Sequence, residues 1–401
     1  MIKPALVKYS FENIYKRRRR SWLTIVSVLI GIASITALIS FGYGISFYVS
    51  SMSNKMGNDK IIVMAKGMSP MGSSVKFDKF DINTIEGVNG VAEVMGMYAI
   101  SAEVEYNKEK RYAYLIGGDF KKHRTLLEEL TTVEIIVGDP LSSNEKSKAV
   151  LGYNYQFADK IFSKPLKLGD KIIVNGHPLT ISGFYGAVGT PDDDSQIYVT
   201  EVAAEGVFRA TSYTEIFVRT SPGENATKVA EDVAKELRKH RNQKKGAEDF
   251  FVQTFEQVIA TFTSILNVII AVVILIAVIS VIVASVNIMN TMYASILERT
   301  KEIGIFKAIG ARNSEILWIF MTESGILSLT GGIIGVILGF AIAKIGGSII
   351  ASAGYGFFAP YFNWQMVASI LLFSFAVGII AGFLPSHKAS KLSPVEALRY
   401  E

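Results

Sequence analysis

The sequence has no cysteine and little charge, and both shortages narrow what the chain can be. Without cysteine it can form no disulfide framework, no cysteine-ligated zinc site and no thiol nucleophile. Only 19% of the 401 residues are charged and 50% are hydrophobic, which is too apolar for an ordinary soluble protein. The composition therefore predicts a membrane protein. The net charge of +5 gathers largely near the N-terminus beside an apolar run, which indicates contact with membrane lipids rather than nucleic acid.

Signals for catalysis are also missing. A nucleotide-binding P-loop needs G-x-x-x-x-G-K-[ST], and the sequence contains no Gly-Lys pair. No Ser/His/Asp or paired-carboxylate arrangement can be assembled, so we expect no enzyme activity and no cofactor in this chain. Asp192, Asp193 and Asp194 are consecutive and point in different directions, which favours a solvated turn over a metal site. The four histidines are expected at the surface: His123, His177, His240 and His387.

The chain begins with a strongly basic segment. Residues 1–20 carry seven Lys and Arg, including the run Arg17–Arg20, and are expected to form a cytoplasmic amphipathic helix. The charge-free stretch that follows gives a first membrane span at 21–45. A secretory signal peptide would have a similar charge pattern, but this apolar run is longer than the 7 to 15 residues typical of one and no A-x-A-like site follows it. We therefore interpret it as an uncleaved anchor.

Residues 46–250 are polar and mixed, and predict an α+β domain inserted after the first span. An Asn175-Gly176 pair predicts a tight turn between two of its strands. Helices are expected at Asp78–Glu86 and Ala226–His240. Strands are expected at Lys60–Met64, Val91–Tyr106, Arg111–Gly117, Lys171–Val174, Thr180–Phe184, Gln196–Val199 and Glu215–Arg219.

The next segment contains no glycine or proline from Ala247 to Ile303, which predicts one unbroken helix. It includes the second span, 251–290, and is long enough to project as a stalk toward the inserted domain. Apolar residues recur along it every three or four positions and predict a seam packed on a partner helix, for which Ser46–Met56 is a candidate. The seam begins with Phe251, Phe255, Val258, Phe262 and Ile265.

Two further spans are expected at 316–345 and 364–384, followed by a tail at 385–401. The third span carries Gly331, Gly335 and Gly339 four residues apart, which predicts a close helix-packing face within the bundle or at a dimer interface. It also carries Glu323, for which we favour a structural role near the headgroups or in an ion pair with the hinge or tail over a proton or substrate role. Lys and Arg number seven in the N-terminal segment, four in residues 290–317 around the hinge and three in the tail, so both termini are expected in the cytoplasm.

A charged hinge at 298–311 separates the second and third spans. Its ions would each cost roughly 2.5 to 3.5 kcal/mol inside the bilayer, so the hinge must lie outside it. A helical wheel does not separate its apolar and charged residues, because Glu302 lies only about 20° from Ile309 at 100° per residue. The pattern by itself therefore leaves a solvated loop and a docking site equally open.

The hinge and two later segments resemble the MacB-like ABC transporter permeases, which share the FtsX-like membrane domain and are also called type VII or mechanotransmission permeases. The hinge E-R-T-K-E-I-G-I-F-K-A-I-G-A resembles the family's cytoplasmic coupling segment. Residues 323–335, E-S-G-I-L-S-L-T-G-G-I-I-G, resemble its third-span signature, and 385–399, P-S-H-K-A-S-K-L-S-P-V-E-A-L-R, its closing motif. The likeness extends over the whole chain and is weakest in the inserted domain.

The resemblance implies a four-span α-helical permease whose α+β domain lies outside the cell membrane on a helical stalk. It implies a separate ABC ATPase that binds ATP and Mg, and a second permease copy in a homodimer or heterodimer, with an extracytoplasmic adaptor left open. ATP hydrolysis would drive export of a drug, peptide, lipid or lipoprotein; the alternative is a signal relay that activates an external partner without transport. The residues implied in ATPase coupling are Glu298, Arg299, Lys301, Glu302, Ile303, Gly304, Phe306, Lys307 and Gly310.

Within this hinge, Ile303, Ile305 and Phe306 are expected to offer an apolar anchor to the ATPase. We expect Gly304→Trp or Glu302→Lys to uncouple ATP hydrolysis from transport without unfolding the permease.

Overall fold

The computed structural model describes residues 18–66, 76–131, 134–356 and 359–399. The amphipathic helix expected at 1–20 lies almost entirely outside these residues. The chain divides into two compact units. A helical unit comprises Met1–Phe47, Ile265–Ala351 and Phe358–Glu401, and a sheet unit comprises Tyr48–Ser264 with Ser352–Phe357.

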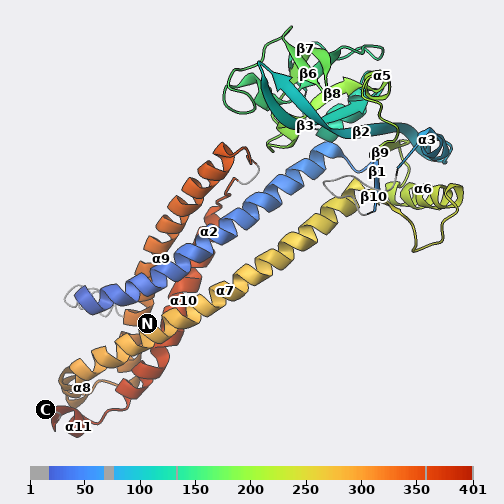
Figure 1. The fold of residues 1–401 in the computed structure, drawn as a ribbon. Helices are drawn as coiled ribbons and strands as arrows, with labels where there is room; N and C mark the ends of the chain where they lie inside the picture. The colour runs from blue at the N-terminus through green and yellow to red at the C-terminus, as the bar shows by residue number, and fades with distance from the viewer. Residues whose placement is uncertain (1–17, 67–75, 132–133, 357–358, 400–401) are drawn as a thin grey trace. The chain divides into compact units, whose positions relative to one another are not determined.

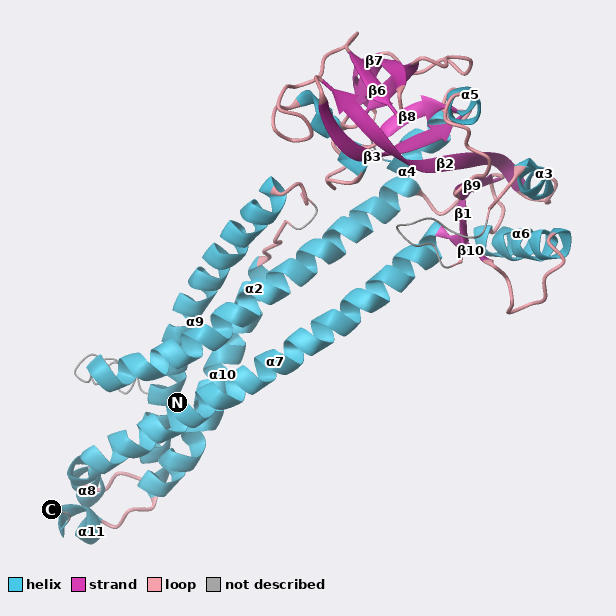
Figure 2. Ribbon diagram, viewed as in Figure 1, coloured by secondary structure: helices cyan, strands magenta, loops and turns pink. Residues whose placement is uncertain are grey.

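The sheet unit is built on one ten-stranded mixed sheet, shown in Figure 2. The strand order is β10-β1-β9-β2-β3-β8-β5-β7-β4, and β6 pairs with both β2 and β7. The strands are β1 Lys60–Ala65, β2 Val91–Tyr106, β3 Glu109–Gly118, β4 Ile135–Gly138, β5 Lys148–Leu151, β6 Lys171–Val174, β7 His177–Tyr185, β8 Ile197–Thr200, β9 Glu215–Thr220 and β10 Phe250–Thr254. The helices are α3 Lys79–Glu86, α4 Arg124–Thr131, α5 Glu201–Gly206 and α6 Ala226–His240, with short 3-10 turns η1 Tyr153–Gln156 and η2 Asp193–Ser195.

Two apolar clusters cover parts of this sheet on opposite faces. Alternate residues of a strand point to opposite faces, so Ile61 and Val63 of β1 belong to one cluster and Ile62 to the other. The first cluster includes Val229, Val233 and Leu237 of α6, and the second includes Leu126, Leu127 and Leu130 of α4. The sequence therefore supplies an independent core for this unit.

All seven predicted strands and both predicted helices of this domain are present. Asn175 and Gly176 form the turn between β6 and β7, both with positive φ, at 46° and 83°, as a two-residue hairpin requires. Three strands, β4, β5 and β10, and two helices, α4 and α5, were not predicted. Two of the predicted surface features are wrong: His123 is buried against Glu93, and Asp194 is buried and accepts hydrogen bonds from the amides of Val188 and Gly189. Both are buried because a local partner satisfies the polar group.

The helix expected from Ala247 begins at Phe255, as α7 Phe255–Glu298. Phe251 lies in β10 instead, where it pairs with Met64 of β1. Thr254 and Gln257 form a reciprocal capping box: the Thr254 amide donates to Gln257 Oε1 at 3.1 Å and the Gln257 amide donates to Thr254 Oγ1 at 3.2 Å. The strand edge and this cap together fix the helix start eight residues later than expected.

The sheet unit includes residues 48–56 and 255–264, which are the ends of two long helices. The long helices are labelled in Figure 1. They are α2 Arg18–Met56, α7, α9 Asn313–Ser352 and α10 Trp364–Ser390, with the short α8 Thr300–Ala308 and α11 Pro394–Arg399. Within the described ranges, four segments are long and apolar enough to span a membrane: Thr24–Met52, Phe255–Glu298, Asn313–Ser352 and Trp364–Ser390. The four predicted spans fall on these segments, although α2, α9 and α10 extend beyond the predicted ends.

Gly331, Gly335 and Gly339 pack α9 directly against α2. A Cβ added at Gly335 would lie 2.9 Å from Ile32 Cβ and 2.9 Å from the Leu29 carbonyl oxygen. At Gly339 it would lie 2.6 Å from the Ala33 carbonyl oxygen. This glycine face is therefore occupied within one chain. On another side of α9, Ser328 Oγ donates to the Ser374 carbonyl of α10 at 2.6 Å, and Ser374 Oγ donates back to the Ser328 carbonyl at 2.8 Å.

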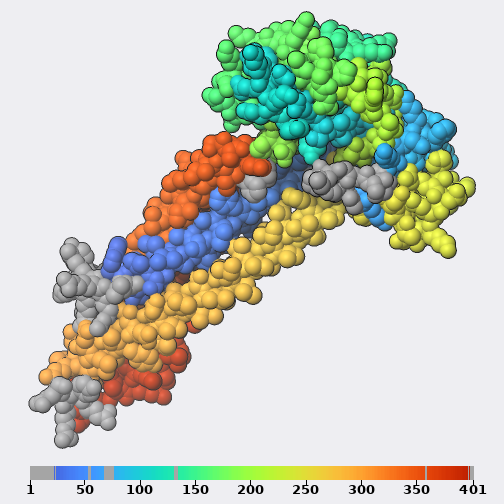
Figure 3. Space-filling view, in the orientation of Figure 1, coloured from blue at the N-terminus to red at the C-terminus, as the bar shows by residue number. Residues whose placement is uncertain are grey.

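The apolar seam predicted along α7 does not pack on α2. Phe255 and Val258 pack against the sheet core, whereas Phe262 and Ile265 remain 48% and 55% exposed. A different face of α7, including Ile270, Ala277, Val281 and Ala284, contributes to the helical unit. The predicted partner segment Ser46–Met56 simply continues α2. Figure 3 shows a flank of α7, in yellow to orange, lying open on the surface.

We predict that Gly335→Ala destabilises the protein by about 1 to 3 kcal/mol, because the added methyl group would overpack against the α2 backbone. Thermal unfolding in detergent measures the effect. The matched control is Gly346→Ala on the same helix, where a Cβ would meet only Phe41, at 3.6 Å, and should change little. Equal unfolding temperatures for the two variants would contradict this packing.

Candidate functional site

The hinge between α7 and α9 is organised by a break at Arg299. The glycine- and proline-free segment was predicted to be one helix through Ile303, but Arg299 has φ −110° and ψ 18° and separates α7 from α8. Helical continuity is lost there although the Arg299 amide still donates to the Ser295 and Ile296 carbonyls. At this break the Arg299 side chain turns toward α9.

Arg299 is buried, with 3% of its surface exposed, and its guanidinium group is held on several sides. Its Nη1 donates to Glu323 Oε2 on α9 at 3.0 Å, and its Nε donates to Glu302 Oε2 on α8 at 3.0 Å. The guanidinium carbon lies 5.1 Å from the centre of the Phe320 ring, within the range of a cation–π contact. Buried charges persist when they are paired and hydrogen-bonded in this way. Arg299 thus clamps the start of α8 to α9.

Glu323 is 5% exposed and is the α9 partner of this ion pair. Pairing with a hinge residue was one of the two structural roles expected for it. The sequence contains one indication that Glu323 receives a cationic side chain: Phe320 and Glu323 are three residues apart and share one face of α9, so both can contact the same group. Sequence analysis did not predict that Arg299 would be the partner.

The inner face of α8 belongs to the core of the helical unit. Ile303 is 2% exposed and clusters with Ile316, Phe320 and Ala389, and Phe306 packs against the same cluster. Lys307 Nζ donates to the Leu392 carbonyl at 2.6 Å, and burial lowers the pKa of Lys307. Ile303 therefore cannot act as the exposed apolar anchor that was expected. Gly304 is also buried, so Gly304→Trp would disturb packing and is not a clean test of docking.

The outer face of α8 is exposed and combines charge with apolar surface. Lys301, Glu302, Ile305 and Ala308 are exposed at helical spacing, and Ile309 follows at 77% exposure. Ile305 is 54% exposed, and Lys301 makes no ion pair with any described residue. We call Glu298, Lys301, Glu302, Ile305 and Ile309 the outer hinge face. A mixed face of this kind fits a protein partner better than lipid, because charges next to apolar residues would be buried only at an interface that pairs them.

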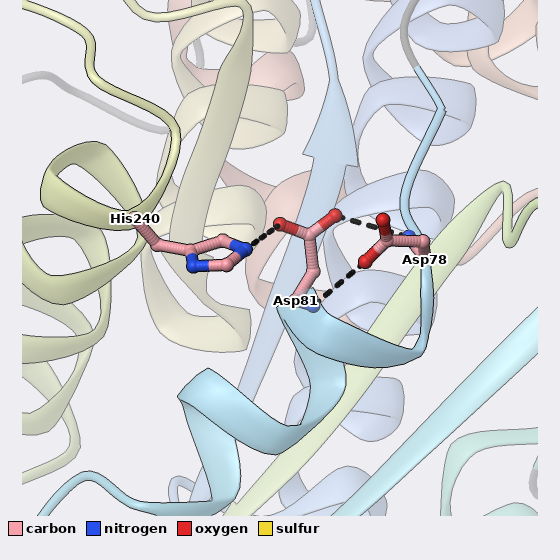
Figure 4. A group of neighbouring side chains, drawn as sticks. All are labelled: Asp78, Asp81 and His240. Carbon is pink, nitrogen blue, oxygen red and sulfur yellow. Dashed lines mark hydrogen bonds and ion pairs between the residues drawn. The ribbon is translucent and has the colours of Figure 1, made fainter.

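The described part of the chain also holds one group with metal-ligand spacing, Asp78, Asp81 and His240, shown in Figure 4. Asp78 and Asp81 form the capping box of α3: Asp78 Oδ1 accepts from the amides of Phe80 and Asp81, and Asp81 Oδ2 accepts from the Asp78 amide. Asp81 also pairs with Arg241 at 2.9 Å. Backbone amides and the Arg241 guanidinium group thus already occupy the carboxylate oxygens that a metal ion would need. We therefore interpret this group as a helix cap.

The architecture defines a class before any comparison is made. Four candidate membrane helices, a separate sheet unit inserted between the first and second, and a charged hinge after the second describe a multi-pass membrane protein with one large inserted domain.

Comparison with known proteins then gives the family. The FtsX-like permease C-terminal model matches residues 274–394, and the MacB-like periplasmic core domain model matches residues 21–236. An ABC transporter permease of Methanocaldococcus jannaschii is 36% identical over 99% of this chain and 98% of its own length. The chain belongs to the ABC transporter permeases of the MacB and FtsX type. Its sheet unit accordingly corresponds to a periplasmic-type domain, and the family in general works with an ATPase.

Other relatives differ in length. The ABC transporter permease YknZ of Bacillus subtilis is 27% identical over 98% of both chains. The macrolide export ATP-binding/permease protein MacB of Bdellovibrio bacteriovorus is 28% identical over 98% of this chain, but the match spans only 61% of MacB. The crystal structure of the periplasmic region of MacB from Actinobacillus actinomycetemcomitans is 16% identical, with a TM-score of 0.43, and covers 52% of this chain and 94% of that one.

We predict that Arg299→Leu destabilises the permease by about 3 to 5 kcal/mol, because it leaves the Glu323 carboxylate buried without its charge partner. Unfolding of the purified protein in detergent measures this. The double variant Arg299→Leu with Glu323→Leu should recover much of the loss, since no unpaired charge remains. Glu302→Gln is the control: Glu302 is 51% exposed, and removing an exposed pair should cost less than about 1 kcal/mol. A double variant no more stable than Arg299→Leu would contradict a coupled pair.

Proposed function

We propose that this chain is the permease subunit of an ABC transporter that couples ATP hydrolysis by a separate ATPase to movement of its sheet unit and so drives export of a substrate. The observation that carries the proposal is the hinge: an exposed charged and apolar face on α8, backed by a buried clamp to α9. The membrane topology proposed with it has both termini in the cytoplasm and the sheet unit outside the cell membrane. ATP and Mg would be bound by the partner, not by this chain.

The outer hinge face supports docking because it exposes two apolar side chains, Ile305 and Ile309, beside Lys301, which makes no ion pair with any described residue. Ile305 and Ile309 present apolar surface to solvent although a core lies on the opposite face of the same short helix. Exposed apolar side chains grouped with charged ones are typical of a surface that a partner covers. Lys301 and Glu302 provide charges of both signs, which can set the orientation of a docked ATPase.

The interior of the hinge supports coupling. Arg299 ties α8 to α9 through Glu323, and Lys307 ties α8 to the segment before α11 through the Leu392 carbonyl. A push on the outer hinge face would therefore move α8 together with its neighbours instead of bending a loose loop. From the hinge, α7 continues without a break to Phe255, and an unbroken helix can transmit displacement along its axis.

We further propose that two copies of the permease act together, as a homodimer or as a heterodimer with a related chain. An extracytoplasmic adaptor is a possible third component. The exported substrate belongs to the classes named above, a drug, peptide, lipid or lipoprotein.

We predict that Ile305→Asp and Lys301→Glu each lower substrate-coupled ATPase activity of the assembled complex at least severalfold, because both change the outer hinge face without touching the clamp. Glu302→Lys should act in the same direction, but it also removes the contact with Arg299. The measurement is ATP hydrolysis and vesicle transport after co-expression with ABC ATPases of the same genome and reconstitution. Glu231→Lys, on an exposed position of α6, is the charge-matched control for Glu302→Lys and should behave as the unchanged protein.

Unaltered ATPase binding and coupled turnover in all three hinge variants would rule out docking at this face. Loss of coupling together with normal ATP hydrolysis would locate the defect in transmission. ATPase-dependent activation of an external enzyme, with no transport in vesicles, would favour the signal relay over export.

A further inference from the structure

The sheet unit contains a pocket, partly open to solvent, that the hinge mechanism does not use. It has a volume of about 510 Å³ and lies within the sheet unit. Pockets for small molecules commonly measure about 300 to 1,000 Å³. The walls are mostly apolar and come from several elements: Leu127 and Leu130 of α4, Ile116 of β3 and Phe217 of β9. Met52 of α2 and Phe255 of α7 complete the lining.

One charged side chain of this cavity has no partner. The Glu215 carboxylate, on β9, makes no hydrogen bond or ion pair with any described residue. The lining contains no Lys, Arg or His among the described residues. The second acid there, Asp193, already accepts hydrogen bonds from Thr190 Oγ1 at 2.6 Å and Gln196 Nε2 at 3.0 Å. Among the described residues, the Glu215 carboxyl group therefore has no basic side chain beside it in the pocket.

Structural partners for Glu215 exist nearby along the strand but are engaged elsewhere. Arg219, four residues further along β9 on the same face, pairs with Glu93 at 3.1 Å and Glu129 at 2.9 Å. Lys60 pairs with Glu129 at 2.8 Å. These basic side chains are thus committed to the other end of the sheet face, and Glu215 is left out of their network.

The pKa of the Glu215 carboxyl group is consistent with a site that a cation could occupy. Burial, and then the nearby charge of Asp193, raise the pKa of the Glu215 carboxyl. Burying a carboxyl group without a partner is unfavourable, and a cation placed beside it would reverse that cost. Aromatic faces available on the wall, Tyr198, Phe217 and Phe255, can also attract a cation.

From this geometry we propose that the cavity binds one small amphiphilic cation, an amine with an apolar group, with Glu215 as its counter-ion and the apolar walls as the site for the rest of the molecule. The apolar group would lie among Leu127, Leu130 and Phe217, and the ammonium group beside Glu215. This site goes beyond the coupling function, and it does not require the ATPase.

The test uses the full-length permease in nanodiscs, without an ATPase, and follows two probes of nearly equal shape by fluorine NMR. One probe is para-(trifluoromethyl)benzylamine, which is cationic at neutral pH, and the other is the neutral para-(trifluoromethyl)benzyl alcohol. Empty nanodiscs give the partitioning of each probe into lipid. We expect saturable binding of the amine at one site and binding of the alcohol at least about tenfold weaker.

Two variants and a control locate the binding. Glu215→Gln keeps the shape of the side chain and should weaken amine binding about tenfold, which corresponds to about 1.4 kcal/mol, while leaving the alcohol unchanged. Ala99→Phe adds a ring at an exposed position of the lining and should block both probes. Glu231→Gln removes an exposed carboxylate on α6 and should bind the amine as the unchanged protein does.

Three results would overturn the proposal: no saturable binding of the amine, equal affinity for amine and alcohol, or amine binding in Glu215→Gln that equals that of the unchanged protein. Circular dichroism of each variant verifies that the sheet unit remains folded. Because no ATPase is present, failure here leaves the coupling proposal unaffected, and failure of coupling leaves this site unaffected.

Discussion

The buried ion pair between Arg299 and Glu323 is the constraint on which the hinge depends. Two charges removed from water are costly, and their attraction compensates for this only while both remain in place. The pair therefore fixes the position of α8 against α9 more strictly than apolar contacts would, because an apolar helix can slide by a turn without losing much. The break in the helix lies at the same residue, Arg299, whose side chain turns inward to Glu323 on α9.

The position of this break explains why periodicity could not predict the hinge. Ile303 and Ile305 are two residues apart, about 200° around an ideal helix, and they have opposite environments, with Ile303 in the core and Ile305 exposed. A helical wheel drawn through 298–311 treats the end of α7 and α8 as one helix. Because the chain departs from helical geometry at Arg299, the faces of α8 do not continue those of α7. Which hinge residues face inward depends on the contact of Arg299 with Glu323 on α9, twenty-four positions away.

The sheet unit shows a similar division between local and distant causes. Strands with long β-branched and aromatic runs, and turns such as Asn175-Gly176, were predicted from local sequence and are present. The strands that were not predicted, β4, β5 and β10, are four or five residues long, and their pairing partners lie far away in sequence. The start of α7 could have been found from Thr254 and Gln257, whose spacing is that of a capping box. The absence of glycine and proline therefore indicated the start of α7 less well than this cap and the pairing of β10 with β1. Glu215 was hidden within a predicted strand, and its lack of a partner appears only once the neighbouring strands are in place.

The long helices of the helical unit differ in how tightly they pack on their neighbours. This difference indicates which helix can move. Helix α9 meets α2 through glycines whose missing side chains bring the two backbones together, and it meets α10 through reciprocal serine hydrogen bonds. Such contacts tolerate little displacement, because a shift of one residue would place larger side chains at each glycine. Helix α7 meets α2 mainly near its foot, where Ile288 and Met292 are buried in an apolar cluster shared with α2 and where Asn287 contacts Ser27 and Thr291 contacts Thr24. Only 6% of its most apolar segment is buried. A lever needs one element that is held firmly at its foot and loosely along its length. Of the long helices described, α7 matches that requirement, with its foot adjoining the Arg299 clamp and its upper end in the sheet unit that carries Glu215.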